Sequence, residues 1–171
     1  MPRKKKIALP KPVLGMDISS IIATTKLHNG FAKLSSSQRR LLIAAILASV
    51  VPCDGKVLDV ELQHYLGHLK THYQFSPQDQ AIAMQFLEKG FNQEELMQAA
   101  RQLTELLSVE DRAKLIGLMW DIACADQDLH KSEAELIFKI ADGAGVVRKR
   151  AVEEQAKAAR ANGLGPQPRA A

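Results

Sequence analysis

A short acidic pattern occurs twice in this sequence, and its residue types and spacing are suited to binding a cation. Asp54 and Glu61 stand seven residues apart in the first copy, and Asp126 and Glu133 stand seven apart in the second, which adds Asp128. Carboxylate oxygens are the ligands that Ca²⁺ and Mg²⁺ prefer. The pattern therefore predicts a composite site for a hard divalent cation, with Zn²⁺ less favoured. Its ligands would be Asp54, Glu61, Asp126, Asp128 and Glu133, with Asp59 and Asp121 as outer candidates.

A second interpretation of the same acids is purely structural. Each Glu falls in the first turn of an expected helix, where a negative charge complements the helix dipole. Asp54 precedes Gly55, a pair typical of turns. Lys56 stands where the second copy has Asp128, so the second copy is the better ligand set. The loops are also too short for an EF-hand, which needs about a dozen residues.

Three histidines follow the first acidic loop at intervals of four residues: His64, His68 and His72. At 100° per residue, Glu61, His68 and His72 share one flank of a helix, while His64 turns further toward solvent. Imidazoles at this spacing can bind Zn²⁺ or Fe²⁺, and Glu-x-x-His occurs in di-iron bundles. The second copy has Leu136 in place of the histidine, so the paired di-iron motif is missing. Solvated histidines are the favoured interpretation.

An offset of 72 residues superposes the two acidic patterns and also superposes Ser36 on Ser108 and Arg40 on Arg112. Helical periodicity and capping signals dominate the chain, and strand alternation is almost absent. We therefore expect an all-α bundle of seven or eight helices, built from similar repeats at 36–91 and 108–161. The expected helices are 36–50, 59–73, 77–90, 93–107, 112–125, 132–141 and 147–161, with a less regular one at 15–33.

Charge is distributed unevenly along the chain, whose formal net charge is +4. Residues 1–12 hold Arg3, Lys4, Lys5, Lys6 and Lys11 without any acid, whereas 13–147 carry more acids than bases. We expect 1–12 to be a disordered basic arm, 13–161 a single helical domain and 162–171 a disordered tail. This separation argues against specific nucleic-acid binding. It leaves open a weak attraction of Arg3, Lys4, Lys5 and Lys6 to an anionic membrane surface.

Several functional classes lack their usual signals in the sequence. The longest apolar run, 41–53, is too short to span a bilayer, and no secretory signal is visible, so we expect a cytoplasmic protein. Cys53 and Cys124 are interpreted as buried thiols and not as a disulfide. The chain shows no phosphate-cradling loop, nucleophile elbow or HExxH motif. These observations predict a protein that is not an enzyme and carries no organic cofactor.

The duplicated loop reads Asp-Gly-x-apolar-x-x-x-Glu in the first copy and lies within IACADQDLHKSEAELIFKIADGAGV in the second, and in this it resembles the tellurite-resistance TerB family. The resemblance covers about residues 36–161. It implies a compact helical domain with an acidic, cation-binding surface, of a kind found in bacterial stress systems and in membrane-anchored DnaJ-like co-chaperones. Carried over residue by residue, it implies a site made of Asp54, Glu61, Asp126 and Glu133. Gln127 departs from the family pattern, because it stands where the first copy has Gly55.

Two functions follow as hypotheses. The first is a stress-response module of the TerB type that binds a divalent cation and interacts with protein partners. The alternative is a metal-independent adaptor or co-chaperone-like domain that associates weakly with membranes through its basic arm. A histidine-dependent metalloenzyme is a third and less favoured hypothesis.

Overall fold

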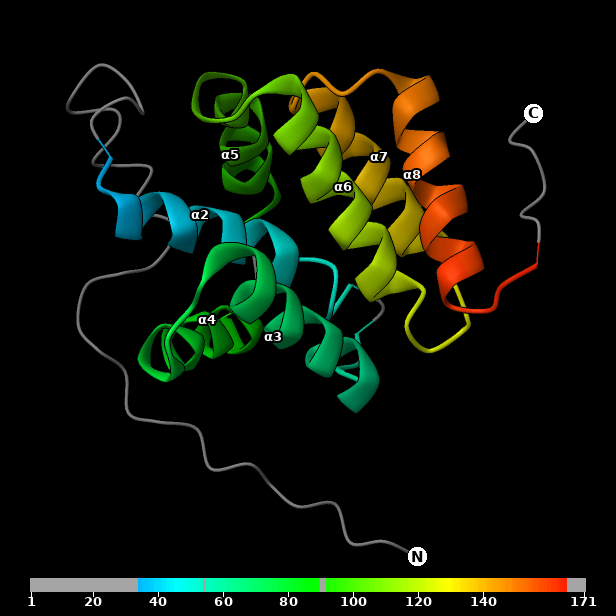
Figure 1. Ribbon diagram of the computed structural model, residues 1–171, viewed down its shortest axis with the longest axis horizontal. Helices are drawn as coiled ribbons and strands as arrows, with labels where there is room; N and C mark the ends of the chain where they lie inside the picture. The colour runs from blue at the N-terminus through cyan, green and yellow to red at the C-terminus, as the bar shows by residue number, and fades with distance from the viewer. Residues whose placement is uncertain (1–33, 54, 90–91, 166–171) are drawn as a thin grey trace, which may run out of the picture.

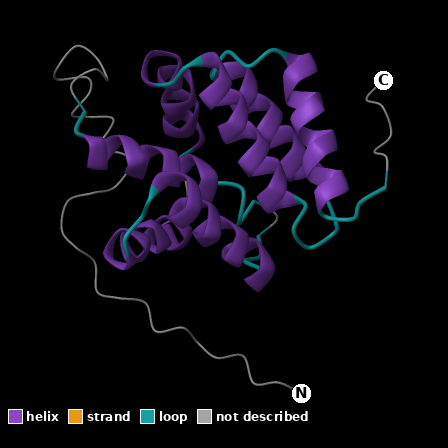
Figure 2. Ribbon diagram, viewed as in Figure 1, coloured by secondary structure: helices purple, strands orange, loops and turns teal. Residues whose placement is uncertain are grey.

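A computed structural model describes residues 34–53, 55–89 and 92–165, and every regular element in these ranges is a helix (Figures 1 and 2). The predicted all-α class is confirmed. The basic arm, the expected helix at 15–33 and Asp54 lie outside the described residues. The helices are α2 (Ser36–Ala48), α3 (Asp59–Tyr73), α4 (Pro77–Lys89), α5 (Gln93–Leu106), α6 (Val109–Ala123), α7 (Lys131–Gly143) and α8 (Arg148–Ala161).

Side-chain caps set several helix starts, as the sequence predicts. Ser35 Oγ accepts from the Gln38 amide at 3.2 Å, and Gln38 Oε1 accepts from the Ser35 amide at 2.9 Å, which makes a complete capping box on α2. Asn92 Oδ1 accepts from Glu94 N at the start of α5. Helix α6 begins at Val109 and not at Arg112, because Ser108 caps it by accepting from Asp111 N at 3.1 Å.

The observed helices follow the offset of 72 residues. Helices α2, α3 and α4 correspond in order to α6, α7 and α8, and all three pairs of helices within each set pack against one another. Helix α5 connects the two sets and packs against α2, α6 and α7 (Figure 1). Between the sets, α3 and α2 both contact α6.

One hydrophobic core runs through both sets of helices. Every residue from Leu41 to Ala48 in α2 is buried, so this helix is covered on all sides. Trp120 of α6 is fully buried and meets the Phe138 ring edge-on, with the ring centroids 5.0 Å apart. The Tyr65 hydroxyl lies 3.1 Å from two carbonyl oxygens, those of Ala44 and Ala83, and so ties α3 to α2 and α4. No helix in the described ranges is both long and apolar enough to cross a bilayer.

The two acidic loops share an unusual backbone conformation. Gly55 has φ +82° and Gln127, its counterpart at the same offset, has φ +64°. Glycine adopts this left-handed region without steric cost, whereas a residue with a Cβ loses roughly 1–2 kcal/mol there. The second loop therefore keeps the turn of the first although its glycine is missing, and Gln127 is a strained residue.

Replacing Gln127 with glycine should therefore stabilise the protein. We expect Gln127→Gly to raise the free energy of unfolding by about 1 kcal/mol, measured by urea denaturation. The matched control is Gln63→Gly, at an exposed position inside α3, which should lower it by about 1 kcal/mol. A loss of stability in Gln127→Gly comparable to that of the control would contradict the strained conformation.

Candidate functional site

The two glutamates of the predicted acidic site occupy matching buried positions. Glu61 lies in the first turn of α3 and is 1% exposed, and Glu133 lies in the first turn of α7 and is 0% exposed. Leu58 and His130 are the corresponding N-caps, again separated by the repeat offset. Glu133 Oε2 accepts from the His130 amide at 3.1 Å. Burial of this degree is unusual for a glutamate and exceeds what a dipole-complementing surface residue needs.

The aspartates of the second loop differ in exposure. Asp126 is half-buried, and its Oδ1 accepts from the Asp128 amide at 2.9 Å, which closes a small turn. The Asp128 side chain is 76% exposed and lies 3.8 Å from His130 Nε2. Asp126 therefore faces the protein, whereas Asp128 faces solvent.

The complete five-residue acidic site stays a prediction. Asp54, the first member of the set, lies outside the described residues. Within the described ranges, Glu61, Asp126, Asp128 and Glu133 do not form a group of three whose ligand oxygens all lie within 4.8 Å of one another. A cation bound by the second loop would need Asp128 to turn inward.

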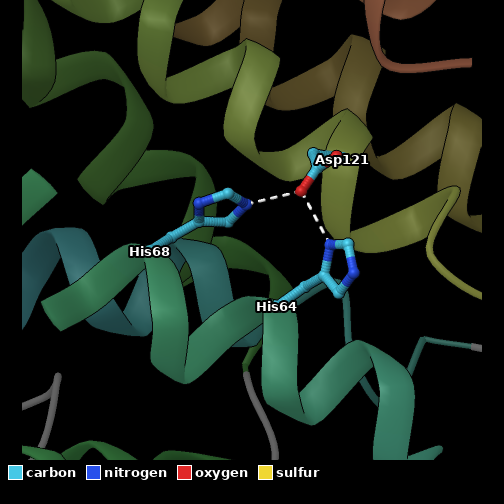
Figure 3. A group of neighbouring side chains, drawn as sticks. All are labelled: His64, His68 and Asp121. Atoms are coloured by element: carbon cyan, nitrogen blue, oxygen red, sulfur yellow. Dashed lines mark hydrogen bonds and ion pairs between the residues drawn. The ribbon is translucent and has the colours of Figure 1, made fainter. Parts of the chain in front are cut away.

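A second polar group joins the two sets of helices where α3 meets α6. His64 Nδ1 lies 2.8 Å from Asp121 Oδ2, and His68 Nε2 lies 2.6 Å from the same oxygen (Figure 3). The side chains of His64, His68 and Asp121 are 32%, 18% and 22% exposed. The two imidazoles, one turn apart on α3, thus converge on a single carboxylate of α6.

This arrangement corrects the sequence-based interpretation of the histidines. His64 and His68 are only partly exposed, because both contact Asp121, although His64 is the more exposed of the two. His72 is exposed, as the sequence predicts. Helix α6 covers the flank of α3 that carries His64 and His68. The angular positions of residues on a single helix do not show which flank a neighbouring helix will cover. His72 does not contact Asp121, although its ring centroid lies 5.6 Å from that of His68.

Asn162, at the C-cap of α8, completes the surroundings of Asp121. Its Nδ2 donates to Asp121 Oδ1 and to the Ala158 carbonyl, both at 2.8 Å. Burial alone would raise the pKa of Asp121, but hydrogen bonds from His68, Asn162 and His64 outweigh it and hold the pKa well below its ordinary value. Asp121 is therefore ionised at neutral pH. Asn162 is not predictable as a partner of Asp121 from the sequence, since its only local signal is that of a helix end.

A cavity of about 680 Å³ lies between α2, α3, α6 and α8. Its wall contains Tyr73, Leu107 and Leu118, and His72 also lines it. Burial, followed by the charge of Asp111, raises the pKa of Tyr73 to about 12. The cavity is mainly apolar, with charged side chains at its edge.

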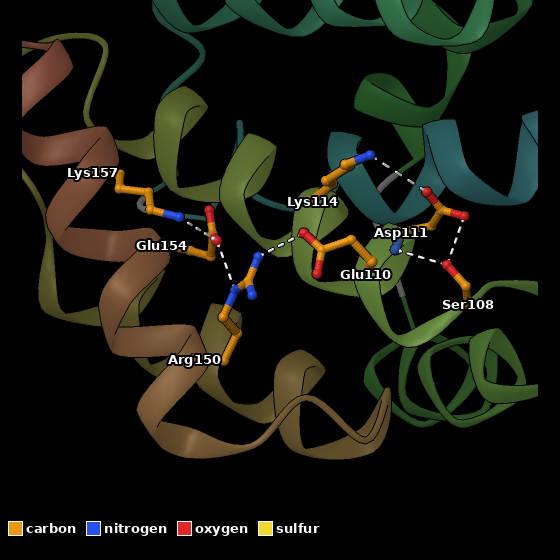
Figure 4. A network of polar contacts seen from close by, with 7 residues as sticks. All are labelled: Ser108, Glu110, Asp111, Lys114, Arg150, Glu154 and Lys157. Carbon is orange, nitrogen blue, oxygen red and sulfur yellow. Dashed lines mark hydrogen bonds and ion pairs between the residues drawn. The ribbon is translucent and has the colours of Figure 1, made fainter.

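Ion pairs join α6 to α8 (Figure 4). Two of the side chains in this network, Glu154 and Lys157, also line the cavity. Glu154 accepts from Arg150 Nε at 2.9 Å and from Lys157 Nζ at 3.1 Å, and Arg150 Nη2 donates to Glu110 at 2.8 Å. Glu154 approaches α6 closely because Gly117 has no side chain; a Cβ at Gly117 would lie 2.7 Å from Glu154 Oε2. These contacts are structural, since they hold α8 against α6.

The thiol of Cys124 lies close to the acidic residues of the second loop. Burial, followed by the charges of Asp121, Glu133 and Asp126, raises the pKa of its thiol to about 12. Very little of this thiol is then ionised at pH 8, and the thiolate is the reactive form. Cys53 is only half-buried, and both cysteines remain as thiols.

Thiol labelling at pH 8 should therefore distinguish the two cysteines. We expect Cys53→Ala, which retains Cys124, to react with a disulfide reagent only after denaturation. Cys124→Ala, which retains Cys53, should react in the native state. The measurement is the rate of absorbance change with and without guanidinium chloride. Rapid native labelling of Cys124 would contradict its burial and raised pKa.

Comparison with known protein families identifies the family to which this chain belongs. A family model described as "Tellurite resistance protein TerB" matches residues 40–157, which span α2 to α8 and both acidic loops. Comparisons with curated proteins and with solved structures give no match. The matched region covers well over half of the sequence, and the chain therefore belongs to the TerB family.

Proposed function

We propose that this chain is a non-enzymatic TerB module of a stress-response system, which binds a hard divalent cation at its acidic loops and transmits that state to a protein partner. Ca²⁺ or Mg²⁺ is favoured over Zn²⁺, because the predicted ligands are all oxygens. The family match supports the module. The cation and the partner are the parts of the proposal that need experiment.

The matched burial of Glu61 and Glu133 carries this proposal. Moving an ionised carboxylate out of water costs several kcal/mol unless charge or hydrogen bonds compensate for it. The protein buries a glutamate at the same position in both sets of helices, and Asp126 adds a further acid close to Glu133 and Cys124. A divalent cation bound at the second loop would offset the negative charge that Glu133 and Asp126 place there.

A non-enzymatic role is supported by the state of the side chains most suited to nucleophilic chemistry. The buried Cys124 thiol, with a pKa of about 12, is a poor nucleophile at neutral pH. Tyr65 is fully buried, and burial strongly raises the pKa of its hydroxyl. These groups serve packing and hydrogen bonding.

Calorimetric titration with Ca²⁺ and with Mg²⁺ tests the proposed cation site. We expect saturable binding by the wild type and at least a tenfold weaker affinity in the double variant Asp126→Asn, Glu133→Gln, because two of the ligand charges are lost. Glu135→Gln is the matched control, since Glu135 is exposed on the same helix as Glu133. Its Oε1 lies 3.7 Å from Lys131 Nζ in a surface ion pair. Heat of binding unchanged in the double variant would reject the site.

The charge of the N-terminal arm favours a second candidate function, a metal-independent adaptor at an anionic membrane surface. Arg3, Lys4, Lys5 and Lys6 form a basic run beside a domain with an excess of acids. Each basic residue near such a surface contributes about 1 kcal/mol.

Liposome sedimentation tests the adaptor function. Vesicles with anionic lipid should retain the full chain at low salt and release it at high salt. Deletion of residues 1–12 should abolish retention, whereas vesicles of neutral lipid should retain neither form. Equal retention of the full and shortened chains would count against a role for the arm.

A further inference from the structure

We infer that His64, His68 and Asp121 form a binding site for a transition-metal ion of the Zn²⁺, Co²⁺ or Fe²⁺ class, at the contact between the two sets of helices. The ligand atoms His64 Nδ1, His68 Nε2 and Asp121 Oδ2 all lie within 4.8 Å of one another (Figure 3). Within the described ranges, no other group of three His, Cys, Asp or Glu side chains meets this criterion. This site is separate from the acidic loops and does not depend on the function proposed above.

The geometry needs little change to admit an ion. Tetrahedral zinc with ligand distances of about 2.0–2.1 Å places neighbouring ligand atoms roughly 3.3 Å apart. The two nitrogens lie 2.8 Å and 2.6 Å from Asp121 Oδ2, so each nitrogen–oxygen separation must widen by about half an ångström or slightly more. Small side-chain rotations supply such a shift.

The elements hold the ligands in place before any ion arrives. His64 and His68 are one turn apart and therefore share a face of α3, as in other helical zinc sites. Asn162 donates to Asp121 Oδ1, which leaves Oδ2 directed at the histidines. Partners of this kind fix the orientation of a metal-binding carboxylate. The site is thus supported from α3, α6 and the end of α8.

The donor set selects the class of metal. Two imidazole nitrogens and one carboxylate suit Zn²⁺, Co²⁺ and Fe²⁺, whereas Ca²⁺ and Mg²⁺ require a shell of oxygens. Three protein ligands leave at least one coordination position for water or another ligand. The partial exposure of all three side chains gives solvent access to that position.

Charge also favours a cation at this place. Asp121 lies in the last turn of α6, where the helix dipole is negative and the structure places no basic residue. Asp126 follows the same helix end, and the charges of Asp121, Asp126 and Glu133 act together on Cys124. A metal ion at Asp121 would reduce this accumulated negative charge.

The site occurs once and is not a product of the repeat. At the offset of 72 residues, His64 and His68 correspond to Leu136 and Ile140, and Asp121 corresponds to Ser49. Ser49 Oγ instead donates to the Ile46 carbonyl at 2.6 Å. The polar ligands of one copy therefore correspond to apolar or small residues in the other. They lie where α3 contacts α6. An ion bound here would link the two sets of helices.

Titration of the full, untagged and chelator-treated chain with Co²⁺ and Zn²⁺ tests this inference. The wild type should bind one Co²⁺ with the visible absorption of a low-symmetry nitrogen and oxygen site, and Zn²⁺ should displace it. We expect His64→Gln, His68→Gln and Asp121→Asn each to weaken Co²⁺ binding at least tenfold. His72→Gln is the matched control, because His72 is on the same helix but does not contact Asp121, and it should bind as the wild type does.

Two further measurements keep the outcomes distinct. Circular dichroism identifies any variant that fails to fold. If Asp121→Asn is unfolded, the test rests on His64→Gln, because this variant retains the His68–Asp121 contact. The variant Asp126→Asn, Glu133→Gln should keep Co²⁺ affinity within a few-fold of the wild type even where it loses Ca²⁺, because it removes nearby charge but no ligand of this site, which separates this site from the acidic loops. Absence of Co²⁺ and Zn²⁺ binding by the wild type, or equal weakening in His72→Gln, would overturn the inference and leave the three residues as a hydrogen-bonded link.

Discussion

The structure depends on burying α2 and α6 as the central helices of two similar sets. Helix α2 has eight consecutive buried residues, 41–48, so apolar surface must cover it in every direction. Its own set supplies α3 and α4, and the remaining sides are covered by α5 and α6. This requirement brings α3 into contact with α6. Every polar contact between the two sets of helices described above follows from that packing.

Duplication explains the fold better than it explains the polar chemistry. The turns follow the repeat, because Gly55 and Gln127 share a left-handed conformation. The buried glutamates of α3 and α7 also follow it, since they occupy equivalent positions. The histidines of α3 and the aspartate of α6 break it, since their counterparts are Leu136, Ile140 and Ser49. Packing between two similar units needs only one α3–α6 contact, and the polar residues have accumulated at that one contact.

The sequence predicts the features that depend on interactions between residues close together in the chain. Capping at Ser35, Asn92 and Ser108, together with apolar periodicity, sets the helix class and most boundaries to within a few residues. The partners of His64 and His68 depend on which flank of α3 is covered, and that is a property of tertiary packing. The sequence therefore predicts Asp121 only as an outer candidate of the acidic site, whereas in the structure it accepts from both histidines and from Asn162. The acidic site itself stays a prediction, since Asp54 is outside the described residues.

Both proposed cation sites lie near the C-terminal end of α6, where the electrostatic potential is negative. The helix dipole contributes negative potential there, Asp121 and Asp126 add two carboxylates, and no basic side chain occupies the last turn. Hydrogen bonds from His64, His68 and Asn162 stabilise the ionised form of Asp121 and so preserve its charge instead of removing it. The charge is therefore maintained at neutral pH and remains available to a cation. The nitrogen ligands of the site at Asp121 and the oxygen ligands of the acidic loops would then favour different cations at the two proposed sites.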